Sequence, residues 1–306
     1  MNNRKFKIGV IGLGDIAQKA YLPIITRKED LELVFATRSE EVLDKLAKKY
    51  NVKNKVSSVD KLIEKDIDAA LVHAATKAHY KIVKALLEND IHVFVDKPIT
   101  YSFDKSKELV ELANKKDLKF FVGFNRRFVP MYKKAKDEIS APKIVKMEKN
   151  STIGADEIRQ MIFDDFIHVI DTLRLMGEGR TEVIDIHSIT EDDLMHRVNI
   201  LLRSGESNLY GMMNRNNGIT EESLEVTGFK EKRVVNGLTE MEIYNNGEKK
   251  VTKSDGWNPM LYNRGFEDMI DEFLYILRND LSTKRLAEDF LETHRLCEEI
   301  VNYCNK

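Results

Sequence analysis

The feature that most constrains the fold is the apolar run from Ile8 to Ile11, because a glycine-rich turn follows it directly. The turn reads GLGDIA and matches the pattern G-x-G-x-x-A. In this pattern Gly12 permits a tight strand-to-helix turn, Gly14 lets the backbone approach a pyrophosphate, and Ala17 lets helix and strand pack closely. A pyrophosphate would lie at the helix N-terminus, where free N–H groups and the helix dipole favour negative charge. The predicted pyrophosphate site comprises Gly12, Gly14, Asp15, Ile16 and Ala17.

Further apolar runs follow at the spacing of β-α units, and amphipathic helical patterns fill the gaps between them. These runs are apolar throughout, which is typical of parallel strands covered on both faces. The pattern predicts an α/β domain over residues 1–122 with a doubly wound Rossmann sheet. The predicted strands are Ile8 to Ile11, Leu33 to Ala36, Ala69 to His73, His92 to Val95 and Phe120 to Val122.

The pattern changes over residues 123–306, which we predict to be a second domain. One long helical pattern runs from about Ala155 to Met176, and short alternating segments follow it. Such alternation is typical of an antiparallel sheet with one covered face. The predicted strands are Val183 to Ile189, Val198 to Leu202, Leu209 to Met213 and Glu240 to Tyr244, and the closing helices are Phe266 to Leu277 and Leu286 to Tyr303.

Charge and composition argue against several classes of partner. The chain carries 49 basic and 51 acidic side chains without a long run of one sign, so we expect neither nucleic acid nor a membrane surface as a partner. A strand begins close to Met1 and no apolar stretch is long enough to span a bilayer, so we expect a cytoplasmic protein. Cys297 and Cys304 suit neither a disulfide framework nor a zinc site, and we expect both to be reduced packing residues.

The end of the second predicted strand bears on the choice of cofactor. NAD-preferring Rossmann domains place an acidic residue there, about 20 residues beyond the glycines, to bind the adenine-side ribose. This chain has Thr37, Arg38 and Ser39 instead, which can bind a 2'-phosphate by charge and hydrogen bonds. NADP is therefore the preferred cofactor, with NAD possible. In the alternative interpretation Arg38 is a solvated loop residue and Ser39 caps the helix that begins with Glu40.

A lysine follows the strand that ends at Val95, in the sequence Asp96-Lys97-Pro98. Ligands of open α/β sheets bind at this carboxyl edge, where Lys97 can hydrogen-bond a substrate oxygen. The alternative is a surface lysine that only ends a strand. Pro98 fixes the backbone here and is a candidate for a cis peptide bond.

Asp164, His168 and Asp171 form a second candidate site within the long helical pattern. Spacings of four and three place them on one face of an α-helix, where the carboxylates fix the tautomer of the histidine and make it a better general base. The alternatives are an exposed polar stripe or a metal site. We predict no metal, because no further His or Cys ligand is suggested nearby.

Taken together, these motifs resemble the Gfo/Idh/MocA oxidoreductases over essentially the whole chain, and the MviM branch in particular. This resemblance implies a Rossmann domain, a C-terminal α/β domain with an open, mostly antiparallel sheet, and assembly into a homodimer or homotetramer. It also implies NAD(P)-dependent oxidation of a sugar, polyol or related alcohol. The motifs that carry it are Gly12 to Ala17, Ile16 to Ala20, Val95 to Pro98, the Asp164-His168-Asp171 helix, Val122 to Phe128, Gly256-Trp257 and Arg264 to Phe266.

The resemblance also implies roles for individual residues. Lys97 orients and polarises the reacting oxygen, while His168 with Asp164 handles the proton. The further residues predicted to bind the cofactor are Ala75, Thr76, His79, Asp96 and Lys97. The chain departs from the family pattern at Asp96, where glutamate is common, at Ala75 to Lys77, where Thr-Pro-Asn is common, and at Phe166, where glycine is frequent.

Three more polar or aromatic side chains, together with Asp171, are candidates for substrate binding. Asn125 and Arg126 follow a strand, and Arg126 suits a carboxylate or phosphate unless it only forms a salt bridge. Trp257 either covers a sugar face or packs as an ordinary apolar side chain.

Fold does not fix function, so two other functions stay open beside the dehydrogenase. One is a non-catalytic dinucleotide sensor or regulatory binding protein. The other is an oxidoreductase that keeps its cofactor bound and shuttles hydride between two sugars.

Overall fold

The computed structural model describes residues 5–305, and its contacts divide them between two compact units. The first unit comprises Met1–Gly123 with Ile270–Leu291, and the second comprises Phe124–Met269 with Glu292–Lys306. This differs from a single cut between residues 122 and 123, because the last two long helices contribute to both units. These helices are α10 (Phe266–Arg278) and α11 (Lys284–Cys304).

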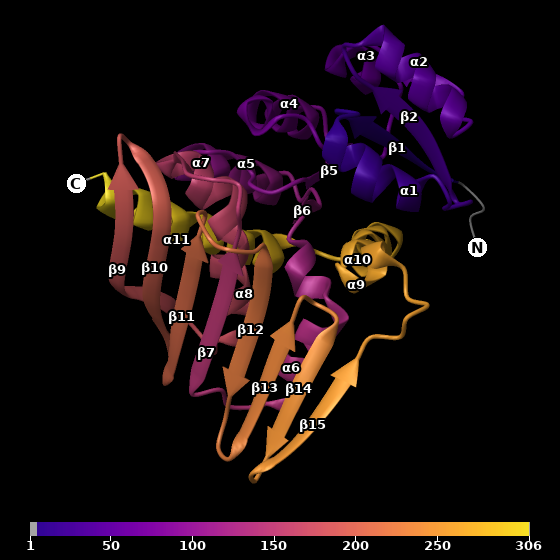
Figure 1. Cartoon of the computed structure of the whole chain (residues 1–306). Coiled ribbons are helices and arrows are strands. Elements are labelled where there is room, and N and C mark those ends of the chain that lie inside the picture. The colour runs from indigo at the N-terminus through magenta and orange to yellow at the C-terminus, as the bar shows by residue number, and fades with distance from the viewer. Residues whose placement is uncertain (1–4, 306) are drawn as a thin grey trace. The chain divides into compact units, whose positions relative to one another are not determined.

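The first unit is a doubly wound α/β domain, as the sequence predicts (Figure 1). Its six strands are parallel and lie in the order β3-β2-β1-β4-β5-β6, the order of a Rossmann fold. The strands are β1 (Phe6–Ile11), β2 (Leu31–Ala36), β3 (Asn54–Val56), β4 (Ala69–Val72), β5 (His92–Val95) and β6 (Phe120–Val122). The helical segments are η1 (Ala17–Tyr21), α1 (Leu22–Ile25), α2 (Glu40–Lys49), α3 (Val59–Ile63), α4 (Thr76–Glu88) and α5 (Phe103–Lys115).

Strand β3 escapes sequence reasoning because it has three residues, of which only Val56 is buried. Strands β4, β5 and β6 are buried almost completely, which explains their continuous apolar runs. An aromatic cluster shows why part of the C-terminal helices belongs to this unit. The ring of Phe94 lies 5.4 Å from those of Phe121 and Phe273, and Phe290 lies 5.5 Å from Phe121.

The second unit is built on a nine-stranded mixed sheet (Figure 1). Eight strands lie in the order β15-β14-β13-β12-β7-β11-β10-β8, and β9 pairs with β10. Strands β7 and β11 are parallel, and every other pair is antiparallel. The strands are β7 (Ile144–Asn150), β8 (Asp156–Glu157), β9 (Thr181–Glu191), β10 (Leu194–Ser204), β11 (Ser207–Asn214), β12 (Glu221–Thr227), β13 (Glu231–Asn236), β14 (Glu240–Asn245) and β15 (Glu248–Lys253).

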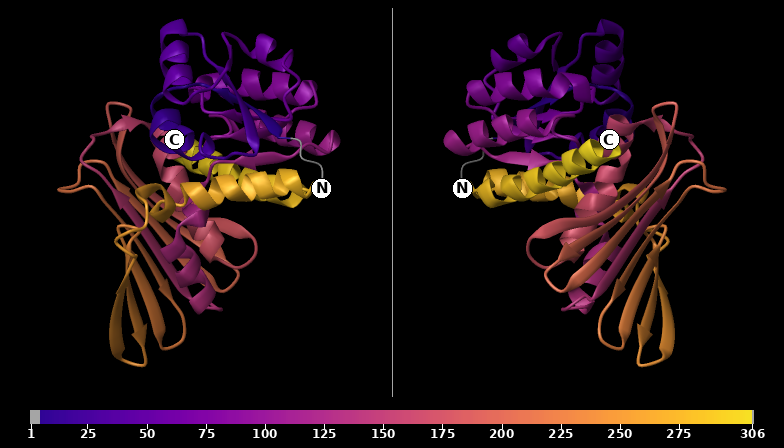
Figure 2. Two further views of the ribbon diagram at one scale, coloured as in Figure 1. Left: turned by 90° about the vertical axis from the view of Figure 1, so that its right-hand side faces the viewer. Right: turned by 90° about the vertical axis from the view of Figure 1, so that its left-hand side faces the viewer.

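Helices α6 and α8 lie beside one face of this sheet (Figure 2). Val198 and Ile200 of β10 point into that covered face, and Gly211 of β11 leaves no room for a side chain beneath α8. A Cβ at Gly211 would lie 2.9 Å from Val169, so the glycine lets helix and sheet approach closely. The helical segments are η2 (Asn125–Phe128), α6 (Pro130–Glu138), α7 (Ile158–Gln160), η3 (Met161–Phe166), α8 (Ile167–Met176) and α9 (Met260–Asn263).

The described residues also bear on the membrane and cysteine expectations. No helix within residues 5–305 has both the length and the apolar character needed to cross a membrane. Cys297 and Cys304 are free thiols, as predicted, and Cys297 is fully buried. Burial raises the pKa of the Cys297 thiol well above its usual value, which suits an inert packing residue.

Candidate functional site

The turn after β1 has the geometry that its glycines predict. Gly12 adopts a φ of +83°, and a Cβ there would lie 2.5 Å from the backbone nitrogen of Ala74, so no other residue fits. Around Gly14 the space is open to at least 4 Å, so a ligand can approach its backbone. Ala17 is fully buried, while Asp15 and Ile16 are exposed in the first turn of the helix. This cradle fits the pyrophosphate of a dinucleotide.

The end of β2 carries an exposed cation. Arg38 is exposed and forms no ion pair or hydrogen bond within residues 5–305. The Ser39 hydroxyl accepts a hydrogen bond from Val42 N–H at 3.4 Å and caps α2, and Thr37 N–H donates to the Val56 carbonyl oxygen at 3.3 Å. Ser39 therefore has the capping role that the sequence left open, while the Arg38 side chain is exposed.

Lys97 follows β5 in a turn held by Asp96. One oxygen of Asp96, Oδ1, accepts the Lys97 N–H at 3.0 Å and the Tyr21 hydroxyl at 3.0 Å. The Lys97-Pro98 peptide bond is cis. Burial raises the pKa of the Asp96 carboxyl, and Lys97, the Tyr21 hydroxyl and His79 partly oppose that rise.

His79 of α4 ties this turn to the loop after β4. It is 1% exposed, its Nδ1 lies 2.9 Å from the Pro98 carbonyl oxygen, and its Nε2 lies 2.8 Å from that of Ala74. Both ring nitrogens thus face main-chain oxygens of the protein. The predicted cofactor residues Ala75 and Thr76 cap and begin the same helix, and Ala75 is exposed.

Sequence reasoning missed two buried residues beside this turn. The rings of Tyr21 and His73 are stacked with centroids 3.8 Å apart. Both ring nitrogens of His73 are buried without a hydrogen-bond partner. Burial, and to a lesser degree the charge of His79, lowers the pKa of His73 to about 3. A tyrosine in a helix and a histidine that follows a strand carry no sequence signal for such a pair.

The predicted long helix, from Ala155 to Met176, is interrupted. It begins as strand β8, continues as the short helix α7, becomes the π-helix η3 and ends as α8. A π-helix has a wider turn than an α-helix, so the spacing of four from Asp164 to His168 does not define one α-helical face. His168 is 8% exposed, and Asp164 is half-buried in η3. Such π segments are frequent at functional sites.

The carboxylate of Asp171 binds side chains of the protein itself. It is fully buried, accepts hydrogen bonds from Arg127 Nε at 2.9 Å and Nη2 at 2.6 Å, and accepts a third from the Thr293 hydroxyl at 2.9 Å. The expectation that Asp171 contacts substrate therefore needs correction, because both of its oxygens bind the protein itself.

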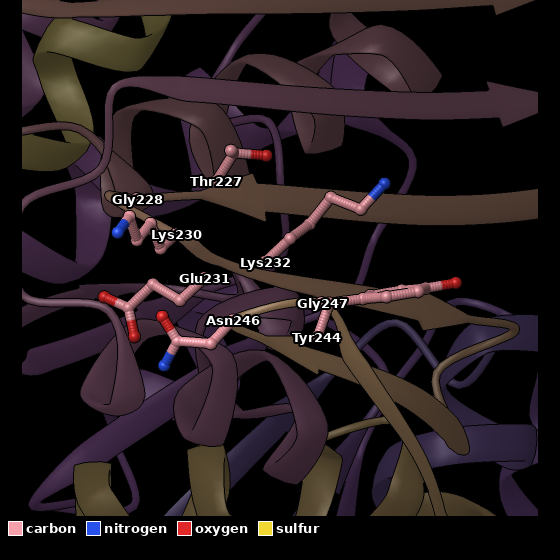
Figure 3. Close-up of a pocket in the computed structure, with 8 residues that line it drawn as sticks. All are labelled: Thr227, Gly228, Lys230, Glu231, Lys232, Tyr244, Asn246 and Gly247. Carbon is pink, nitrogen blue, oxygen red and sulfur yellow. The ribbon is translucent and has the colours of Figure 1, made fainter.

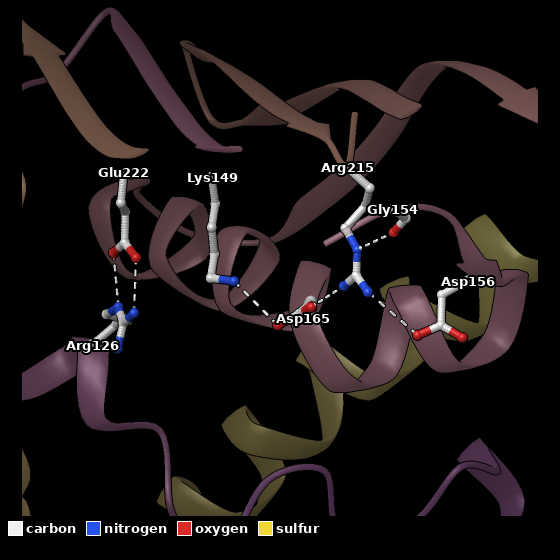
Figure 4. Close-up of polar contacts among 7 residues, drawn as sticks. All are labelled: Arg126, Lys149, Gly154, Asp156, Asp165, Arg215 and Glu222. Atoms are coloured by element: carbon white, nitrogen blue, oxygen red, sulfur yellow. Dashed lines mark hydrogen bonds and ion pairs between the residues drawn. The ribbon is translucent and has the colours of Figure 1, made fainter. Parts of the chain in front are cut away.

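Arg126 and Asn125 are likewise engaged by the protein. The Arg126 guanidinium forms a two-point ion pair with Glu222, at 2.7 and 2.8 Å (Figure 4). The Tyr132 hydroxyl donates to the same carboxylate at 2.9 Å. Although burial opposes ionisation of Glu222, the charge of Arg126 holds the pKa of that carboxyl below its usual value. The Asn125 side-chain amide donates to the Arg264 carbonyl oxygen at 2.9 Å, so the Asn125 amide nitrogen and the Arg126 guanidinium both bind the protein itself.

A second charged cluster holds η3 in place. Asp165 of η3 accepts from Arg215 and, at 3.1 Å, from Lys149 of β7 (Figure 4). Arg215 also donates to the Gly154 carbonyl oxygen at 2.9 Å and pairs with Asp156 at 3.4 Å. Sequence spacing gave no sign of this cluster, because its members come from four separate segments.

Trp257, the last predicted substrate residue, is 94% exposed, so it does not pack as an ordinary apolar side chain within the chain. Two hollows lie elsewhere in the second unit. One, of about 610 Å³, lies between the β12–β13 and β14–β15 turns and is lined by Lys232 and Tyr244 (Figure 3). The other, of about 280 Å³, lies beside Leu238 and Met260. Across the described chain no group of three His, Cys, Asp or Glu side chains is placed to hold a metal.

Comparison with known proteins now identifies the family. Residues 6–124 match a model described as an oxidoreductase family with an NAD-binding Rossmann fold, and residues 130–246 match a YceM-like C-terminal domain. A solved Gfo/Idh/MocA oxidoreductase from Vibrio cholerae is 30% identical, with a TM-score of 0.91, over 99% of this chain and 100% of its own. This chain belongs to the Gfo/Idh/MocA family of oxidoreductases. The resemblance inferred from the motifs is confirmed.

Two further relatives match nearly the whole chain. The dehydrogenase MviM of Clostridium difficile is 32% identical, with a TM-score of 0.91, over 98% of this chain and 100% of its own. The putative oxidoreductase YceM of Salmonella typhimurium is 28% identical and covers 97% of both chains. These matches span both units, so the fold class predicted for each part is confirmed.

Proposed function

We propose that this protein is an NADP-preferring oxidoreductase that transfers a hydride between the nicotinamide and a CH–OH carbon of a sugar or polyol. One observation carries the proposal. The Gly12 turn follows β1 and the Asp96-Lys97-Pro98 turn follows β5 of the same parallel sheet, so both lie at its carboxyl edge. That edge is where open α/β sheets bind their ligands.

The substrate class rests on a relative. Myo-inositol 2-dehydrogenase of Thermotoga maritima is 29% identical over 199 residues, which are 61% of this chain and 60% of that protein. The match supports a polyol or cyclic sugar alcohol as the first class to test. The exposed cation of Arg38 and the neighbouring Thr37 support NADP, because a guanidinium and a hydroxyl can bind a 2'-phosphate, the first through charge-assisted hydrogen bonds.

Three side chains act in the proposed reaction. When bound, the nicotinamide supplies the hydride acceptor for oxidation or the donor for reduction. As the C–H hydride leaves, His168 accepts the hydroxyl proton and Lys97 stabilises the charge that develops on the oxygen. Asp164 is assigned the orientation of His168 from the family motif that the two residues match. A ketone and a protonated histidine result, so proton and hydride are both accounted for.

Replacing Lys97 tests the proposed reaction. In Lys97→Ala we expect kcat/KM with a polyol and keto-sugar panel to fall by about a thousandfold, because the developing oxyanion loses its cationic donor. NADPH binding, followed by energy transfer from the protein, should persist. Lys107→Ala, on the exposed face of α5, is the matched control and should keep full activity. Binding without turnover in wild-type protein across the whole panel would favour a dinucleotide sensor.

Replacing Arg38 tests the cofactor preference. Wild-type protein should bind NADPH at micromolar or tighter concentration and NADH at least tenfold more weakly. Arg38→Ala should weaken NADPH binding about tenfold and leave NADH binding unchanged, whereas Lys45→Ala on α2 should change neither. Tighter binding of NADH by wild-type protein would contradict the phosphate-site argument. Nucleotide released only on denaturation would indicate a permanently bound cofactor.

A further inference from the structure

Tyr21 occupies an unusual place for a tyrosine. It is the last residue of η1, the π-helical turn that follows the glycine motif, and it is fully buried in the first unit. Its ring stacks on that of His73, and its centroid lies 5.7 Å from that of Phe94 in a T-shaped arrangement. Packing therefore fixes the direction in which its hydroxyl points.

That hydroxyl reaches the turn that carries Lys97. It donates to Asp96 Oδ1 at 3.0 Å, and the same oxygen accepts the Lys97 N–H. Gly123, which follows β6, packs against this contact. A Cβ at Gly123 would lie 2.8 Å from the Tyr21 hydroxyl and 2.9 Å from Asp96 Oδ1, so only glycine leaves the pair undisturbed.

The π-helical turn determines the direction in which the Tyr21 side chain points. One extra residue in an α-helical turn rotates the following side chains by about 100°, since an α-helix has 3.6 residues per turn. Tyr21 is the last residue of the widened turn, and the buried Ala17 of the glycine motif is its first. The segment thus serves both the cofactor cradle and the Lys97 turn.

We propose that Tyr21 is a positioning residue whose hydroxyl holds the Asp96 carboxylate, and through it the Asp96-Lys97-Pro98 turn, in the arrangement that presents Lys97 to the reacting oxygen. This inference rests on the role of Lys97 in the proposed function. It assigns to the family's glycine-motif helix a second task beyond binding pyrophosphate.

The charges around Asp96 give the proposal a measurable signature. Tyr21 faces Asp96 from η1, His79 from α4 and Lys97 from the next position in the chain. The Tyr21 hydroxyl favours the ionised carboxylate and so opposes the rise in the Asp96 pKa that burial causes. Removal of that hydroxyl must therefore raise the pKa of Asp96 further. A protonated Asp96 has no charge with which to orient Lys97.

The test compares two tyrosine-to-phenylalanine variants of the full chain. Tyr21→Phe removes the hydroxyl on Asp96. Tyr132→Phe is the matched control, because Tyr132 is also fully buried and also donates to a carboxylate, that of Glu222, at 2.9 Å. The Asp96 carboxyl is titrated by carbon-13 NMR of protein labelled at aspartate, with Asp96→Asn assigning the signal. NADPH binding, kcat/KM over pH and the melting temperature are measured in parallel.

In Tyr21→Phe we expect Asp96 to bind its proton about tenfold more tightly and the acid limb of kcat/KM to move to higher pH by the same factor. The dissociation constant of NADPH should stay within about twofold of the wild-type value. Tyr132→Phe should lower the melting temperature but leave the Asp96 titration and the acid limb of kcat/KM unchanged. If Tyr21→Phe does not fold, Asp96→Asn serves as the second variant. Asp96→Asn keeps an oxygen that can accept the Tyr21 hydroxyl. At every pH its turnover should equal the low turnover that wild-type protein shows at pH values below the acid limb.

Three results overturn the inference, and they differ in whether the proposed function survives. If Lys97→Ala is inactive but Tyr21→Phe leaves the Asp96 titration and the acid limb unchanged, Tyr21 is only a packing residue and the proposed function survives. Full turnover by Asp96→Asn also refutes the positioning role. If Lys97→Ala keeps full turnover, the proposed function fails and the positioning role fails with it.

Discussion

At the scale of single residues, His73 shows how burial overrides the ordinary chemistry of a side chain. It is 4% exposed, it stacks on Tyr21, and its ring nitrogens have no hydrogen-bond partner. A charged imidazole there would lose its hydration without compensation, so the folded protein holds the ring neutral. The consequence is a pH dependence of stability that originates in one side chain.

Because the pKa of His73 is about 3 when folded and 6.5 when unfolded, its neutral form favours the native state above pH 6.5. That stability is lost as the pH falls from 6.5 toward 3, because the unfolded chain binds the proton more tightly. The loss at pH 5 relative to pH 7.5 is about 2 kcal/mol. Urea unfolding at both values should show His73→Phe losing less stability than wild-type protein by that amount. Parallel losses in the two proteins would contradict the burial argument.

At the scale of elements, buried ion pairs connect short segments that sequence reasoning treated as separate. Arg126 of η2 pairs with Glu222 of β12, and Arg127 of the same segment pairs with Asp171 of α8. These pairs are nearly inaccessible to solvent, so the removal of one partner leaves a buried charge without compensation. We therefore assign Arg126 to holding η2 against the sheet of the second unit.

Arg126→Ala tests this assignment against the substrate role predicted from the sequence. We expect a loss of about 3–5 kcal/mol in the free energy of unfolding, because Glu222 is left buried and unpaired. The double variant Arg126→Met with Glu222→Gln should recover part of that loss in urea unfolding. A stable Arg126→Ala protein with a raised KM for substrate would instead show that the arginine binds substrate.

At the scale of the whole molecule, the nine-stranded sheet raises the question of assembly. Its face opposite α6 and α8 carries half-buried apolar side chains at the centre, where Leu201 of β10 lies directly across from Tyr210 of β11. Figure 2 shows no helix of this unit over that face among the described residues. We propose that a second copy of the chain covers it in a homodimer or homotetramer.

Analytical ultracentrifugation tests this assembly. Wild-type protein should sediment as a dimer or tetramer, and Leu201→Glu should shift it to monomer, because a charge buried in an apolar interface costs several kcal/mol. Lys45→Glu, on the exposed side of α2, should not change the mass. A monomeric wild-type protein would contradict the proposal directly.

The sequence by itself determined the Rossmann sheet, because buried parallel strands require continuous apolar runs and the turn at Gly12 requires glycine. It also placed Lys97 at the end of β5, because the lysine follows the apolar run of that strand in the sequence. Both inferences need only the pattern of consecutive residues and the backbone conformation that this pattern requires. Alternation likewise indicated an antiparallel sheet in the second part.

Only the tertiary structure decided which polar groups were already engaged. Asp171, Arg126 and Asn125 look available in the sequence, yet each binds a partner at least 44 positions away. The π-helix η3 broke the assumed α-helical face, and η1 brought Tyr21 to Asp96 across 75 positions. Spacing along the chain reports local periodicity, whereas the pairing of buried charges depends on how distant segments meet, and this is why the fold could be predicted more fully than the site.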